Sequence, residues 1–144
     1  MNINIKLVDG GKTPIFKHEL DACADCSARI SANTDAIAIP GHTRCLVNLG
    51  FAIEIPEGYE GVIRPRSGNS LNGIDIAIGT IDAGYRGEVK ACVINNRQDP
   101  FIVHNGDRIC QLAIRKTEKI NFIEVNELSD SERGTDGFGS TEIK

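Results

Sequence analysis

The chain has 144 residues, which favours a single domain with a sizeable hydrophobic core. Its formal charge of −4 at pH 7 argues against binding nucleic acid or a membrane through bulk positive charge. No apolar run is long enough to span a bilayer, and the first residues lack the apolar core of a signal peptide. We therefore expect a cytoplasmic protein without a direct nucleic-acid or membrane partner.

Short runs rich in isoleucine and valine alternate with glycine, proline, asparagine and aspartate along most of the chain. This pattern predicts an all-β fold, a jelly roll or distorted β-barrel with little helix. In chain order, the expected strands cover residues 4–8, 35–39, 44–55, 61–64, 74–81, 88–95, 101–103, 109–116 and 120–125.

Glycine, proline and polar residues divide these strands. Gly50 is the expected bulge in the long strand 44–55. Residues 56–59 and 105–107 are typical of turns, and residues 67–72 of a helical turn. From residue 128 the chain is polar and glycine-rich, so we expect a β-barrel domain over residues 1–127 and a mobile C-terminal arm over 128–144.

Five cysteines, an odd number, lie mostly in apolar segments, which is typical of reduced thiols packed as small hydrophobic residues. Cys23 and Cys26 form a C-x-x-C pair that could serve redox or zinc chemistry. No second cysteine pair or histidine cluster completes a zinc tetrad. The sequence leaves the purpose of this pair open.

Four segments of the barrel carry candidate polar site residues. Asp25 lies among small apolar residues, which suits a capped turn or a water-bridged magnesium ion. Arg66, Ser67 and Gly68 open the helical turn, and they suit either an ordinary capped turn or a phosphate site. Gln111 is polar within an apolar strand, so its amide needs a structural partner or a ligand.

The fourth segment, residues 79–88, predicts a β-hairpin with Ala83-Gly84 as its two-residue turn. Residues that flank such a turn face each other, so Asp82 and Tyr85 are expected on one side. Held there, the carboxylate could orient a water or a sugar hydroxyl while the phenol ring packs under a ribose. The alternative is an ordinary hairpin tip with a solvated aspartate.

Near its end the chain combines closely spaced glycines with two hydroxyls, an arginine and an aromatic ring. Consecutive glycine amides can point at one anion, and arginine offers a planar fork to phosphate. The ring is free to stack on a flat ligand, although the composition also suits a solvated tail. The segment reads Arg133-Gly134-Thr135-Asp136-Gly137-Phe138-Gly139-Ser140-Thr141.

In their order and spacing these segments resemble the trimeric dUTPase family, and the resemblance covers the chain from about residue 20 to residue 141. The family's second, third, fourth and fifth motifs match residues 64–68, 79–88, 106–111 and 133–141. In the first motif only Ala22 and Asp25 match. The segment between the second and third motifs is shorter than in many members.

The resemblance implies a jelly-roll homotrimer whose active sites are shared between chains, and which hydrolyses dUTP to dUMP and pyrophosphate. This reaction limits uracil incorporation into DNA and supplies dUMP for dTMP synthesis. By this resemblance Asp82 is the catalytic residue that orients the attacking water, and Asp25 supports Mg²⁺ indirectly through water. The implied substrate-binding residues are Arg66, Ser67, Gly68, Gly79, Ile81, Tyr85, Gln111, Arg133, Phe138, Gly139, Ser140 and Thr141.

Within that set, Tyr85 would lie under the deoxyribose and exclude a 2′-hydroxyl. Phe138 would stack on uracil, and Arg133, Ser140 and Thr141 would reach the γ-phosphate.

Two other functions are compatible with the same scaffold. A dCTP deaminase needs a catalytic glutamate on the strand after the turn, but the corresponding position is Cys92, which cannot act as a carboxylate acid or base. A nucleotide-regulated module that binds a protein partner would bind dUTP without hydrolysing it.

Overall fold

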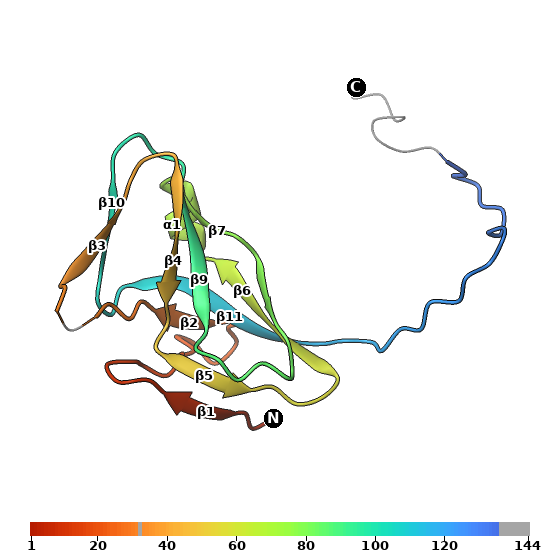
Figure 1. Ribbon diagram of the computed structural model, residues 1–144, viewed down its shortest axis with the longest axis horizontal. Helices are drawn as coiled ribbons and strands as arrows, with labels where there is room; N and C mark the ends of the chain where they lie inside the picture. The colour runs from red at the N-terminus through yellow and green to blue at the C-terminus, as the bar shows by residue number, and fades with distance from the viewer. Residues whose placement is uncertain (32, 136–144) are drawn as a thin grey trace.

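The computed structural model describes residues 1–31 and 33–135, which form eleven strands and one short helix (Figure 1). The expected all-β architecture is confirmed. One antiparallel sheet has the strand order β2 (Ala24–Ser27), β11 (Arg108–Lys116), β6 (Tyr59–Pro65) and β8 (Gly79–Ile81). A second has the order β4 (Thr43–Asn48), β9 (Lys90–Asn95) and β7 (Ile74–Ile76).

Two strand pairs complete the barrel: β1 (Asn4–Leu7) with β5 (Phe51–Glu54), and β3 (Ala36–Ile39) with β10 (Phe101–His104). One continuous hydrophobic core joins all four sheets. Its fully buried side chains include Phe51, Ile63, Val93 and Val103, one from each sheet. This shared core makes the sheets one domain of jelly-roll type.

Two expected long strands are each split between two sheets. The first breaks at Gly50, whose positive φ of 77° turns the chain from β4 into β5. A Cβ on Gly11 would lie 1.9 Å from the Gly50 carbonyl oxygen, so the N-terminal loop crosses close to this break. The expected strand 74–81 likewise divides into β7 and β8, which belong to different sheets. Gly50 is therefore a crossing between sheets rather than a bulge in one strand.

Two other expectations about strands were wrong. Residues 120–125 form no strand, because the chain leaves the barrel after β11 and extends away from it, so that no strand of the described ranges lies beside it (Figure 1). Conversely, residues 24–27 form β2, an edge strand made of small residues that pattern alone did not reveal. The remaining expected strands agree with the structure to within a few residues.

The expected helical turn is confirmed as α1 (Ser67–Leu71), and the turn at 56–59 closes with a hydrogen bond from the Tyr59 amide to the Pro56 carbonyl. No helix in the described ranges could span a bilayer. All five cysteines, each within those ranges, are free thiols, as expected. The expected arm begins at residue 128, and its residues 136–144 lie outside the described part of the chain.

Candidate active site

The first polar cluster, which we call the Asp25 cluster, comprises Asp25, Arg66, Arg108 and Gln111. Asp25 on β2 is directly opposite Gln111 on β11. Arg66 follows β6, the neighbour of β11 on its other side, and Arg108 begins β11. Residues from positions 25 to 111 therefore meet because three strands are adjacent in one sheet.

The buried carboxylate of Asp25 organises this cluster. Its Oδ1 accepts hydrogen bonds from Arg66 Nε at 3.0 Å and from Gln111 Nε2 at 3.4 Å. Its Oδ2 accepts from Arg66 Nη2 at 3.2 Å and Arg108 Nη1 at 3.0 Å. Two guanidinium groups thus share one carboxylate, which leaves the cluster with a net positive charge that suits an anion.

Three of these four residues line a cavity of about 340 Å³. Asp25, Arg66 and Gln111 contribute to its wall, together with Lys17 and Cys23. The exposed Ser67 and Gly68 follow Arg66 at the start of α1. The structure therefore brings Asp25 and the expected phosphate-binding residues of the second and fourth motifs into one region.

The second cluster surrounds the turn between β8 and the segment that leads to β9. A cavity of about 210 Å³, which we call the turn pocket, is lined by Gly79, Ile81, Asp82, Tyr85 and Glu88, among others. Asp82 and Tyr85 lie on the same side, as predicted. The predicted β-hairpin is wrong, however, because β8 pairs with β6 whereas β9 pairs with β4 and β7.

The ring of Tyr85 is folded back over its own loop. Its hydroxyl donates to the Glu88 carbonyl oxygen at 3.0 Å. A Cβ on Gly87 would lie 2.4 Å from that hydroxyl, so only glycine leaves room for the ring there. The residue nevertheless remains 45% exposed, which leaves part of the ring available to a ligand.

Glu88 is held by an arginine from a distant part of the chain. Arg29 Nε and Nη2 donate to the two Glu88 carboxylate oxygens at 2.8 and 2.9 Å, and the Gly50 amide donates to Oε1 at 3.0 Å. The Arg29 side chain lowers the pKa of the Glu88 carboxyl, and Glu88 raises the pKa of Arg29. Arg29 is 59 residues from Glu88 and belongs to no motif, so its sequence position alone does not reveal it as a site residue.

A second arginine binds the turn itself. Arg86 Nη1 donates to the carbonyl oxygens of Ala83 and Tyr85, and Arg86 Nη2 donates to Glu54 Oε1 at 3.2 Å. The Asn4 amide also donates to Glu54, at 2.8 Å. The turn is therefore attached to β5 through Glu54 as well as to the loop after β2 through Arg29.

The two clusters lie far apart within one chain. Asp25 on β2 and Arg64 on β6 are both directly opposite Gln111 of β11, which lies between them. Ile81 on β8 is opposite Gly61 of β6. Asp82 is therefore about four residues along the strands and three strands across from Asp25. At about 3.3 Å per residue and 4.8 Å per strand, this separation is roughly 20 Å. The carboxylate of Asp82 and the Asp25 cluster cannot contact neighbouring atoms of one nucleotide in the same chain.

The C-terminal motif is described only in part. Arg133 is exposed in the segment that extends from the barrel. The expected contacts of Phe138, Gly139, Ser140 and Thr141 lie outside the described residues. Residues 1–31 and 33–135 contain no group of three histidine, cysteine, aspartate or glutamate side chains that could hold a metal ion.

The chain is similar to dUTPases in both sequence and structure. A family model described as dUTPase matches residues 18–142. A deoxyuridine 5′-triphosphate nucleotidohydrolase of Corynebacterium glutamicum is 48% identical over 121 residues, which cover 81% of this chain and 80% of that protein. The protein of the same name from Cytophaga hutchinsonii is 42% identical over 146 residues, covering 98% and 93%.

A solved structure has the same fold. The dUTPase of Staphylococcus bacteriophage 80alpha, determined with dUPNHPP, superimposes with a TM-score of 0.84 and is 26% identical. The match covers 99% of each chain. Both polar clusters described above lie within residues 18–142, which the family model matches.

Proposed function

The chain belongs to the dUTPase family and is a dUTP diphosphatase, and we propose that its turn pocket and its Asp25 cluster hold the two ends of the substrate. Water attacks the α-phosphorus of dUTP, the bond to the bridging oxygen of the β-phosphate breaks, and dUMP and pyrophosphate leave. The observation that carries the assignment of roles is the shared pocket of Asp82 and Tyr85.

In the turn pocket, Asp82 orients the attacking water and accepts its proton. Tyr85 lies under the deoxyribose, where its fixed ring leaves no space for a 2′-hydroxyl. Main-chain groups of Gly79 and Ile81, which line the same cavity, bind the uracil edge. A hydrogen-bonding main chain suits this purpose because its donors and acceptors are fixed by the pairing of β8 with β6.

The Asp25 cluster binds the phosphates. Arg66, Ser67, Gly68 and Gln111 contact them, and the net positive charge of the cluster stabilises the leaving pyrophosphate. Asp25 itself holds the two arginines in place. Arg133, Phe138, Gly139, Ser140 and Thr141 complete the site from the arm over residues 128–144, with Phe138 on the uracil ring and the hydroxyls at the γ-phosphate.

Magnesium fits this site as an ion carried by the triphosphate. Mg²⁺ keeps several waters and needs few protein ligands when phosphates supply the others. Both oxygens of Asp25 already accept hydrogen bonds from guanidinium groups, so this carboxylate would support the ion through water. When bound, Mg²⁺ neutralises charge that develops on the leaving pyrophosphate.

The active site is shared between the chains of a homotrimer. The separation of roughly 20 Å between the clusters exceeds what one nucleotide allows if Asp82 acts at the α-phosphorus while the Asp25 cluster binds the phosphates. A site that combines the turn pocket of one chain with the Asp25 cluster of another removes this conflict. The arm then closes the site from a chain of the same assembly.

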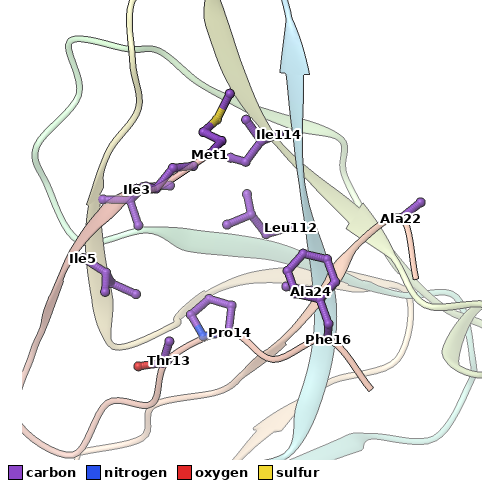
Figure 2. A pocket seen from close by; sticks show the side chains of 11 residues that line it. Met1, Ile3, Ile5, Thr13, Pro14, Phe16, Ala22, Ala24, Leu112 and Ile114 are labelled. Atoms are coloured by element: carbon purple, nitrogen blue, oxygen red, sulfur yellow. The ribbon is translucent and has the colours of Figure 1, made fainter. Parts of the chain in front are cut away.

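Uncovered apolar surface supports this assembly. A cavity of about 410 Å³ beside β1 is lined almost entirely by apolar side chains, among them Ile3, Ile5, Phe16 and Leu112 (Figure 2). The segment that leaves the barrel exposes Ile120, Phe122, Ile123, Val125 and Leu128. Neither surface is covered by the described residues of one chain, and burying them between copies would contribute hydrophobic stabilisation.

The product dUMP supplies dTMP synthesis, and removal of dUTP limits uracil in DNA. We place the enzyme in the cytoplasm, which suits its free cysteines. The family and the curated relatives favour this activity over dCTP deamination. Glu88, the glutamate that follows the turn, is paired with Arg29 and is therefore not free to act as the catalytic glutamate of a deaminase.

Pyrophosphate release from dUTP, dCTP, dTTP and UTP, with and without Mg²⁺, tests this function. We expect rapid release from dUTP in the presence of Mg²⁺ and little from the other three nucleotides. Release of ammonia from dCTP would instead indicate a deaminase. Tight binding of dUTP without turnover would contradict the hydrolytic function and would indicate a regulatory module.

A further inference from the structure

We propose that Arg29 is a positioning residue for sugar discrimination, acting through Glu88 on the ring of Tyr85. This inference rests on the proposed role of Tyr85 under the deoxyribose. Arg29 lies in the loop after β2 and does not line the turn pocket. Its effect must therefore pass through Glu88.

Two consecutive contacts connect Arg29 to Tyr85 through Glu88, and a third contact holds Glu88 in place. Arg29 holds the Glu88 carboxylate with two parallel hydrogen bonds, at 2.8 and 2.9 Å. The Gly50 amide fixes the same carboxylate from a second direction, at 3.0 Å. The main-chain carbonyl of Glu88 then accepts the hydrogen bond from the Tyr85 hydroxyl. Both ends of Glu88, its side chain and its main chain, are thus occupied.

The geometry of this pair favours precise positioning. Both side chains are only 19% exposed, so solvent competes weakly for the hydrogen bonds. A bidentate arginine–carboxylate pair also fixes the relative orientation of its partners, which a single contact does not. Because an extra hydroxyl on the sugar is rejected by a small steric conflict, even a slight displacement of the Tyr85 ring would weaken the rejection.

Loss of the Arg29–Glu88 pair should therefore reduce the discrimination between dUTP and UTP more than it slows dUTP hydrolysis. In the Arg29→Met variant we expect the ratio of kcat/KM for UTP to that for dUTP to rise roughly fivefold to tenfold, the scale of one lost hydrogen bond. Arg29→Lys, which keeps the charge but not the paired geometry, should give a smaller rise. Arg44→Met, which removes an exposed arginine on β4, serves as the matched control and should leave the ratio unchanged.

The experiment measures kcat and KM for both nucleotides with the purified full-length protein, together with Tm. Tyr85→Phe removes the hydroxyl that binds the Glu88 carbonyl and should raise the same ratio. If Arg29 acts through that hydrogen bond, adding Arg29→Met to Tyr85→Phe will change the ratio little further. Should Arg29→Met fail to fold, Glu88→Gln and Arg29→Lys carry the same comparison.

A lower Tm with an unchanged ratio in the Arg29 and Glu88 variants would overturn the inference, because Arg29 would then only stabilise the fold. Fully additive effects of Arg29→Met and Tyr85→Phe would also overturn it. A wrong assignment of Tyr85 would give a different result from a wrong assignment of Arg29. If Tyr85→Ala retains the full preference for dUTP over UTP, Tyr85 does not exclude the ribose at all.

Discussion

Asp25 and Asp82 are both carboxylates, but their surroundings give them different tasks. Asp25 is buried and accepts hydrogen bonds from two guanidinium groups and an amide, so it is committed to holding other side chains. Asp82 is exposed on the wall of the turn pocket, where water has access to it. Of these two carboxylates, Asp82 is the one that is open to water, which is consistent with the role of proton acceptor that we propose for it.

Replacement of Asp82 by asparagine tests this difference. Asparagine keeps the size of the side chain but cannot accept the proton, so kcat for dUTP should fall by roughly 10²–10⁴. Affinity for dUTP and the Tm should change little, because the exposed side chain does not pack in the core. Steady-state kinetics and a binding titration measure both quantities. An unchanged kcat would exclude Asp82 as the base.

At the level of strands, Asn95 shows how a polar side chain stabilises the barrel. It is fully buried at the end of β9. Its Nδ2 donates to the carbonyl oxygens of Ile39 and Asp99, each at 2.9 Å, and its Oδ1 accepts from the Arg97 amide at 3.0 Å. This one amide therefore connects the end of β9 to β3 and to the loop that follows β9.

Asn95→Ala should destabilise the protein by roughly 1–3 kcal/mol, because buried main-chain groups lose their partners. Urea unfolding at a fixed protein concentration measures the change, which keeps any contribution from assembly constant. Asn96→Ala, at the exposed neighbouring position, is the control and should have little effect. Equal effects of the two substitutions would show that the hydrogen bonds of Asn95 contribute little.

The strands were predictable where local pattern determines them. Alternating apolar residues revealed β6, β9 and β11, but the splits at Gly50 and between β7 and β8 depend on which sheet each half joins. No local pattern encodes that choice. The apolar run at 120–125 resembles a strand but pairs with no strand in the described part of the chain. In β2, small residues gave no strand signal, although that strand carries Asp25.

The contrast between local pattern and contacts of distant residues holds for the site as well. Asp25, Arg66, Asp82, Tyr85 and Gln111 were identified from motifs, and the structure groups them into two clusters. Arg29 and Arg108 were missed because their importance depends on partners 59 and 83 residues away. Such contacts arise only when the strands are assembled.

At the scale of the whole molecule, the distance between the two clusters is the basis of the proposed shared active site. If Asp82 acts at the α-phosphorus while the Asp25 cluster binds the phosphates, as we propose, a separation of roughly 20 Å in one chain prevents both from acting on one dUTP. Two copies of the chain can bring them together. Oligomerisation would then be a requirement of catalysis rather than only a source of stability.

Subunit complementation distinguishes a shared site from a site within one chain. Asp82→Asn damages the turn pocket, and Arg66→Ala damages the phosphate side. Each pure variant should be nearly inactive. Mixed assemblies, formed from differently tagged variants and verified by mass, will contain sites that combine an intact Asp82 with an intact Arg66. A mixture of Asp82→Asn with Asp82→Ala is the control, since every turn pocket then lacks the Asp82 carboxylate and no intact site can form.

The first measurement is therefore the rate of dUTP hydrolysis by the mixed Asp82→Asn and Arg66→Ala assemblies. A shared site predicts that activity recovers well above that of either pure variant, while the control mixture stays inactive. If verified mixed assemblies are no more active than the pure variants, each active site is built within a single chain, and the division of dUTP between copies is wrong.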